Sequence, residues 1–130
     1  MGSPSTYHAP GTLPRALFST MKTRILGKRY ELSVVSVPAR RMRELNRRYR
    51  GKDSATDILS FPYGTRSGEI IFHLPTVRAR AKTYALGPAD YLAFLFIHGC
   101  LHLKGEKHGR IMEKLEDRWC RVFHIPLPKR

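Results

Sequence analysis

The segment from Pro88 to Leu103, PADYLAFLFIHGCLHL, restricts the fold of this chain more than any other stretch. Proline is favoured at the first position of a helix, so Pro88 indicates where a helix begins. The residues that follow are strongly apolar, which is typical of a helix packed inside a domain. Gly105 permits the left-handed backbone that ends many helices, and we expect the chain to turn back there.

Further helices and strands are predicted from the spacing of apolar residues. Steps of three and four predict helices over residues 13–27, 38–49, 75–85 and 109–123. Runs rich in β-branched and aromatic side chains predict strands over residues 32–37, 58–63 and 68–74, with Pro62 ending the second strand. Strands clustered between helices predict an α+β fold, in which helices pack on a small mixed β-sheet.

The same spacing identifies side chains expected to face the core. They are Leu13, Leu17, Met21 and Ile25 in the first helix, Met42, Leu45 and Tyr49 in the second, and Ile111, Leu115, Trp119 and Phe123 in the last. Cys100 and Cys120 lie inside apolar helical patterns, which predicts two buried free thiols. Unpaired cysteines favour a reducing compartment, so we expect a cytoplasmic protein.

A chain of 130 residues is expected to form one domain. Residues 1–11 are small or contain Pro and Gly and are expected to be flexible, which leaves residues 12–130 as the domain. No run of about 18 apolar residues occurs, so no membrane-spanning helix is expected. The first 30 residues contain no acidic side chain, and an organellar transit peptide is therefore the alternative to a cytoplasmic protein.

Three histidines, His98, His102 and His108, lie within the eleven residues HGCLHLKGEKH. Residues four apart on a helix lie one turn above each other, so His98 and His102 present two imidazoles to one point. A turn at Gly105 makes His108 available as a third ligand. Three neutral imidazoles suit zinc or another first-row divalent metal, and they leave a position open for water, as in catalytic sites. A purely structural role for the three histidines is the alternative.

The spacing of these histidines is similar to that in HExxHxxGxxH zinc proteases, in which the glutamate activates water for attack on a peptide. This chain has Gly99 at the position of the glutamate, and neither Cys100 nor Leu101 can replace a carboxylate base. The sequence therefore predicts a metal site and argues against a protease of this mechanism.

The charge balance indicates a polyanionic partner. Lys and Arg number 24 against 10 Asp and Glu, which gives a formal net charge of +14 and favours nucleic acid or an acidic membrane surface. Between positions 40 and 52 the only acidic residue is Glu44, and a basic helix of this kind is expected to contact RNA phosphates. The expected RNA-binding residues are Arg40, Arg41, Arg43, Arg47, Arg48 and Lys52. A solvated helix face is the alternative.

Arg50 lies beside Gly51 in the loop that follows this helix. We predict that Arg50 contacts a phosphate group, because the planar guanidinium can donate two hydrogen bonds to phosphate oxygens. Tyr49 and Phe61, in contrast, are expected to pack in the core.

Two long segments resemble the YbeY family of bacterial endoribonucleases, which act in ribosomal RNA maturation. HGCLHLKGEKH is similar to the family's HGxLHLxGxDH, and LNRRYRGKDSATDILSFPYG is similar to its LNxxYRGKDxxTDVLSFP stretch. SGEIIF resembles the family's GDIxI strand. The resemblance runs in order from about Leu32 to Phe123.

This resemblance implies an α+β fold, one zinc ion held by the three histidines, and cleavage of single-stranded RNA. The arginine of the family's YRGKD stretch, which serves activity, falls on Arg50. The resemblance therefore implies that Arg50 reaches the scissile phosphate, where a guanidinium would stabilise the charge that develops on phosphorus. Two positions depart from the family pattern, because Lys107 and Glu69 stand where the family has aspartates. Carboxylates near a metal often orient the ligating imidazoles, and Glu106 or Glu69 is the candidate for that role here.

We therefore expect a single metal-dependent hydrolase domain that acts as an endoribonuclease on ribosomal RNA precursors or at the small ribosomal subunit, with zinc and no small-molecule cofactor. One alternative is a ribosome-associated RNA-binding protein whose metal is mainly structural. Another is a metal-dependent hydrolase that acts on a different substrate.

Overall fold

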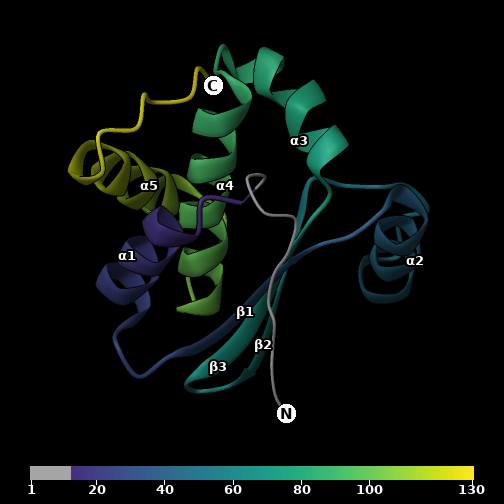
Figure 1. The fold of residues 1–130 in the computed structure, drawn as a ribbon, viewed down its shortest axis with the longest axis horizontal. Coiled ribbons are helices and arrows are strands. Elements are labelled where there is room, and N and C mark those ends of the chain that lie inside the picture. Colours follow the sequence, from purple (N-terminus) through teal and green to yellow (C-terminus); the bar gives the residue numbers. More distant parts are fainter. Residues whose placement is uncertain (1–12) are drawn as a thin grey trace.

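The computed structural model describes residues 13–130, so the expected flexible segment, residues 1–11, lies outside the described residues. All the predicted helices and strands are present, with bounds shifted by a few residues (Figure 1). In chain order they are α1 (Arg15–Leu26), β1 (Glu31–Ser36), α2 (Ala39–Arg50), β2 (Ile58–Gly64), β3 (Ser67–Phe72), α3 (Leu74–Ala81), the 3-10 turn η1 (Lys82–Tyr84), α4 (Pro88–Leu103) and α5 (Arg110–Val122).

The three strands form one mixed sheet in the order β1-β3-β2. Strand β1 pairs with β3 in parallel, and β2 pairs with β3 in antiparallel orientation. The prediction that Pro62 ends its strand was wrong, because β2 continues to Gly64 with a shift of register between these two residues. An edge strand tolerates proline, since the missing N–H is not needed by a second neighbour. The predicted α+β fold with a small mixed sheet is confirmed.

Alternating side chains of the central strand enter two separate cores. Ile70 and Phe72 are fully buried in the main core, which contains α1, α4 and α5. Ile71 points to the other face and packs with Met42 and Leu45 of α2 in a smaller cluster. This alternation follows from the two-residue period of a strand. Helix α2 accordingly lies on the opposite side of the sheet from α1, α4 and α5 (Figure 1).

Helix α4 is the central element of the main core, and the expected burial of this apolar helix is confirmed, because eleven of its sixteen residues are buried. Cys100 and Cys120 are buried and free, as predicted. Among the described helices, none is by itself long and apolar enough to cross a membrane; only Leu74–Tyr84 and α4 taken together meet that criterion, as a pair bent by 100°.

Gly99 lies where α4 crosses the sheet. A Cβ atom at this position would come within 3.0 Å of the side-chain ends of Ile58, Ile70 and Ser60. The position that holds the catalytic glutamate in a zinc protease therefore faces the sheet in this protein, and it has no room for a glutamate side chain. The glycine allows α4 to approach β2 and β3 closely.

Two predictions about the core were wrong. Ile111 is 72% exposed, whereas Leu115, Trp119 and Phe123 are partly buried and pack against the main core as expected. The most buried positions of α5 are Met112, Glu116 and Cys120, one residue along from the predicted ones, and the carboxylate of Glu116 has partners inside the protein.

Tyr49, which was expected in the core, is 58% exposed. The buried position in the last part of α2 belongs to Asn46, whose side-chain amide donates to the backbone oxygen of Ser54 at 2.8 Å. Phe61 is only partly buried, and it packs against the small cluster beneath α2.

Candidate metal centre

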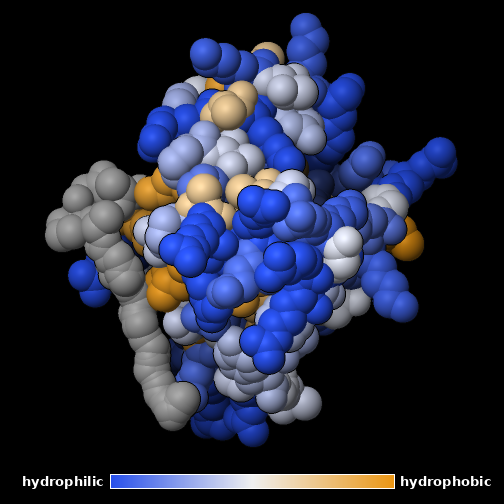
Figure 2. All heavy atoms as spheres, turned by 90° about the vertical axis from the view of Figure 1, so that its right-hand side faces the viewer, coloured by the Kyte–Doolittle hydropathy of each residue, from blue (hydrophilic) through white to orange (hydrophobic). Residues whose placement is uncertain are grey.

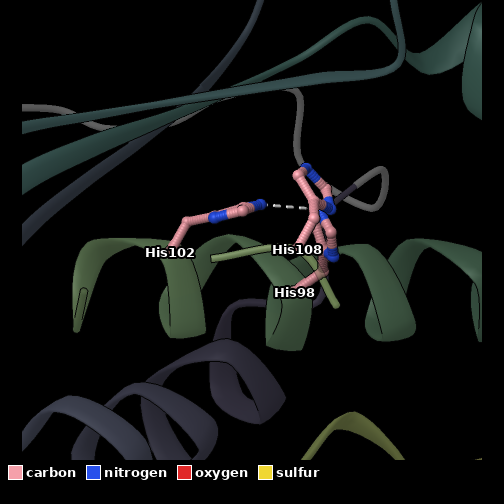
Figure 3. A group of neighbouring side chains, drawn as sticks. All are labelled: His98, His102 and His108. Carbon is pink, nitrogen blue, oxygen red and sulfur yellow. Dashed lines mark hydrogen bonds between the residues drawn. The ribbon is translucent and has the colours of Figure 1, made fainter. Parts of the chain in front are cut away.

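The three histidines predicted as ligands lie together at the end of α4. His98 and His102 are one helical turn apart, and His108 comes from the loop that follows Gly105, whose φ of 108° lets the chain reverse direction. Their nearest ring nitrogens all lie within 4.8 Å of one another. Figure 3 shows the three rings gathered at one point, with the imidazole of His102 directed at that of His98.

Hydrogen bonds fix the orientation of two of these rings. The Nδ1–H of His98 donates to the Oε2 atom of Glu116 at 2.5 Å, and that of His102 donates to the backbone oxygen of Glu106 at 3.0 Å. Both acceptors are oxygen atoms without a proton, so in the neutral form of each ring Nδ1 carries the hydrogen and Nε2 carries a lone pair. The Nε2 atoms of His98 and His102 are 3.1 Å apart.

Two lone pairs that face each other at this distance repel unless a cation lies between them. Two nitrogen ligands of a tetrahedral zinc ion, each about 2.0–2.1 Å from the metal, are separated by roughly 3.3 Å. The observed spacing of 3.1 Å is close to that value. Burial, followed by the proximity of His98, lowers the pKa of His102 and so favours the neutral imidazole that binds metal. The residues of this site therefore fit a divalent metal such as zinc.

Glu116 was not among the residues predicted from the sequence, although its carboxylate fixes the orientation of the His98 ring. Its carboxylate is 4% exposed and accepts a second bond, at 2.7 Å, from the guanidinium of Arg130. Arg130 also donates to Asp117 at 2.9 Å, and it lies over the ring of Phe94. Burial raises the pKa of Glu116, but the bonds from His98 and Arg130 outweigh burial and leave the pKa below its usual range. The indication in the sequence is the position of Glu116, four residues from both Met112 and Cys120, which places it on the same face of the helix.

Glu69 and Glu106 were the candidates to orient a histidine ring in place of the family's aspartates, but neither carboxylate does so. Glu69 is bonded to Tyr63 at 2.5 Å and lies 3.4 Å from the hydroxyl of Ser33, so it is not the carboxylate that orients a histidine ring. Glu106 contributes its backbone oxygen rather than its carboxylate. Lys107 is exposed, which lets its charge remain in water.

The metal centre opens on a groove of about 1200 Å³ that follows the edge strand β2. Its walls include His98, His102 and His108 together with Arg50 and Lys52, so two parts of the chain that are far apart in sequence meet here. The remaining predicted RNA-binding arginines, Arg40, Arg41, Arg43, Arg47 and Arg48, do not line this groove.

Several arginines of α2 are engaged by nearby acids. Arg43 makes a bidentate pair with Asp53 at 2.8 and 3.0 Å, Arg47 lies 4.0 Å from the same carboxylate, and Arg41 pairs with Glu44 at 2.6 Å. Side chains on the face that carries α2 are mostly hydrophilic (Figure 2). These pairs are exposed to water, which screens their attraction, so they can be exchanged for contacts to phosphate.

Within residues 13–130, two of the cationic side chains lining the groove form no ion pair, Arg50 and Lys52. Arg80, which also lines the groove, lies 3.4 Å from the buried carboxylate of Asp57, and Arg130 is bonded to Glu116. Asp57 in addition accepts a hydrogen bond from Tyr91 at 2.7 Å. The positive charge that is available to a ligand is thus concentrated where α2 ends.

Fold and site together define a small α+β protein with three histidines that could hold a metal ion, in a groove that also carries cationic side chains. The family model described as "Endoribonuclease YbeY" matches residues 11–123, and the chain therefore belongs to this family.

Curated relatives and a solved structure agree with this assignment. Endoribonuclease YbeY of Sulfurovum sp. (strain NBC37-1) is 41% identical over 88 residues, which are 60% of each chain. That of Helicobacter pylori (strain Shi470) is 36% identical over 111 residues, which are 79% of each chain. The solution structure of a Thermotoga maritima protein matches with a TM-score of 0.60 and 25% identity, and covers 91% of this chain and 86% of that one. For several curated relatives the match covers less than two thirds of the relative's length. One example is Endoribonuclease YbeY of Thermodesulfovibrio yellowstonii, of which 63% is covered.

Proposed function

We propose that this protein is a metal-dependent endoribonuclease that cleaves single-stranded RNA in ribosomal RNA maturation. The observation that carries the proposal is the meeting, in one groove, of three histidines suited to a metal and the cations Arg50 and Lys52, which form no ion pair within residues 13–130. The relatives carry the name endoribonuclease, which supports RNA as the substrate class.

Zinc is the metal that we propose, held by the Nε2 atoms of His98 and His102 and by a ring nitrogen of His108. Such an ion acts as a Lewis acid toward a phosphate oxygen or lowers the pKa of water. Glu116 keeps the ring of His98 in one orientation, and the backbone oxygen of Glu106 does the same for His102. These contacts reduce the rearrangement that metal binding requires.

Arg50 is proposed to hold the scissile phosphate. Its guanidinium can donate two parallel hydrogen bonds to phosphate oxygens, and these bonds strengthen as negative charge develops in the transition state. Lys52 and the exposed arginines of α2 would then follow the RNA backbone on either side. Precursors of ribosomal RNA, free or on the small subunit, are the proposed substrates, and the free thiols support a reducing compartment such as the cytoplasm.

Cleavage of a labelled single-stranded RNA by the zinc-loaded protein tests this function. We expect His102→Ala to abolish cleavage and Arg50→Ala to lower kcat about 100-fold or more. Arg78→Ala is the matched control, because Arg78 is an exposed arginine of α3 that does not line the groove and is not among the predicted RNA-binding residues. This control is expected to keep kcat within a factor of about three.

Two outcomes contradict the proposal in different ways. Equal cleavage by the wild type, His102→Ala and Arg50→Ala would assign the activity to a contaminating nuclease. Tight RNA binding by a zinc-loaded wild type that cleaves no RNA would favour the alternative, an RNA-binding protein whose metal is structural.

A further inference from the structure

Tyr49 is a large aromatic side chain that the fold leaves unburied. It is 58% exposed in the last turn of α2, and its side chain lines the groove that leads to the metal centre. Exposing so much of an aromatic ring forgoes hydrophobic stabilisation that burial would provide. The position of Tyr49 beside Arg50 raises the question of what covers the ring when substrate is bound.

Two contacts hold the ring in place and still leave more than half of Tyr49 exposed. The ring of Phe61 lies 5.1 Å away, centroid to centroid, at an interplanar angle of 62°, and the guanidinium carbon of Arg48 lies 5.7 Å from the ring centroid. Phe61 is itself anchored, since it packs on the small core cluster beneath α2. A ring held in this way loses little conformational freedom when a flat ligand stacks on it.

The charges around the ring identify the ligand. Arg50 and Lys52 follow Tyr49 within three residues, and both line the same groove without an ion pair in the described part of the chain. A nucleotide offers a flat base for an aromatic ring and a phosphate for a cation, at neighbouring positions. A duplex does not offer the faces of its internal bases, because they are stacked on one another.

We propose that Tyr49, supported by Phe61, is a stacking site for an unpaired nucleobase of the RNA strand whose phosphate is bound at Arg50. The inference rests on the proposed function and extends it, because it gives a physical reason for a preference for single strands. In this proposal Tyr49 binds the RNA, whereas Arg50 and the metal centre contact the phosphate that reacts.

Binding of two polymers to the zinc-loaded protein tests the proposal. One is a 2′-O-methyl oligouridylate of roughly nine nucleotides, and the other is a sugar-phosphate polymer of the same length without bases. We expect the wild type to bind the polymer with bases about 5- to 100-fold more tightly, which corresponds to one stacked base. Tyr49→Ala should lose most of this preference while its affinity for the polymer without bases stays the same.

Three further variants make the result specific. Tyr49→Phe should keep the preference, since it retains the ring. Tyr49→Leu should lose the preference while it still fills the space beside Phe61, and it replaces Tyr49→Ala if that variant does not fold. Tyr63→Ala is the matched control, because Tyr63 is 65% exposed but does not line the groove.

The proposal is overturned if Tyr49→Leu binds the two polymers with the same ratio as the wild type, or if the wild type shows no preference for bases. In both cases RNA binding and cleavage by the wild type would still stand. Failure of the wild type to bind either polymer would instead overturn the proposed function, and the stacking site with it.

Discussion

Glu116 links a candidate metal ligand to the rest of the molecule. It accepts bonds from His98 on one side and from Arg130 on the other, and its carboxylate is almost completely buried. A buried carboxylate with two cationic or polar donors stays ionised, and an ionised partner makes the imidazole of His98 a better electron donor. The strength of the metal site therefore depends on a residue that is not a ligand.

We predict that Glu116→Gln lowers zinc affinity by about 10- to 100-fold, because the amide removes the negative charge beside His98. The measurement is competition with a chelator of known affinity. Glu113→Gln is the control, since Glu113 lines the same groove but is exposed. Equal zinc affinity of Glu116→Gln and the wild type would show that the carboxylate does not act on the metal through His98.

The sequence was sufficient for local parts of the site and insufficient for distant ones. The four-residue spacing of His98 and His102 predicts two imidazoles on one helix face, and the glycine at 105 predicts the turn that brings His108 back. Glu116 reaches this group because α5 packs against α4. The spacing of apolar residues shows only that Glu116 is a polar residue on an apolar helix face. Tyr49 was misplaced because the polar Asn46, which bonds to the backbone of Ser54 in the following loop, takes the buried position in the last part of α2.

At the scale of elements, the packing of α4 against the sheet positions the metal centre. Two ligands belong to the helix body, and Gly99 lies between them in sequence and faces β2 and β3. Apolar periodicity predicted the helix and its burial correctly. The closeness of helix and sheet at Gly99 could not be predicted, because it depends on Ile58, Ser60 and Ile70, which are distant in sequence.

A larger side chain at position 99 is therefore expected to destabilise the protein. We predict that Gly99→Ala lowers the free energy of unfolding by about 1–3 kcal/mol, since the methyl group must displace two buried isoleucine side chains. Gly99→Glu should prevent folding, because it also buries a charge without a partner. Urea denaturation measures the first effect and circular dichroism the second. A stabilised Gly99→Ala would mean that the higher helix propensity of alanine outweighs the crowding.

At the scale of the whole molecule, we expect metal binding to be coupled to folding, because the three candidate ligands come together only in the folded chain. We predict that zinc at about 100 times its Kd stabilises the protein by about 2.7 kcal/mol and raises Tm by roughly 10 °C. His102→Ala should abolish this shift. The exposed His124 provides the control, and His124→Ala should respond to zinc as the wild type does. A shift retained in His102→Ala would place the zinc elsewhere.

The net charge of +14 is a second property of the whole molecule. We predict that RNA affinity falls steeply with salt: the logarithm of the association constant should fall against the logarithm of the salt concentration with a slope of about −0.7 per phosphate contact, and Arg50→Ala should make this slope less steep by roughly 0.7. Arg66→Ala, in the turn between β2 and β3, is the control. Fluorescence anisotropy at several salt concentrations measures the slope, and equal slopes for Arg50→Ala and the wild type would remove Arg50 from the phosphate contacts.

The location of His98 and His102 in the last two turns of α4 has an electrostatic consequence. The peptide dipoles of a helix add up to a partial negative charge of about −0.5 at its C-terminal end. A cation held by these histidines lies at that negative end and is attracted by the backbone itself. The same field repels a phosphate, so the groove needs a positive charge from another element, and Arg50 at the end of α2 is placed to supply it.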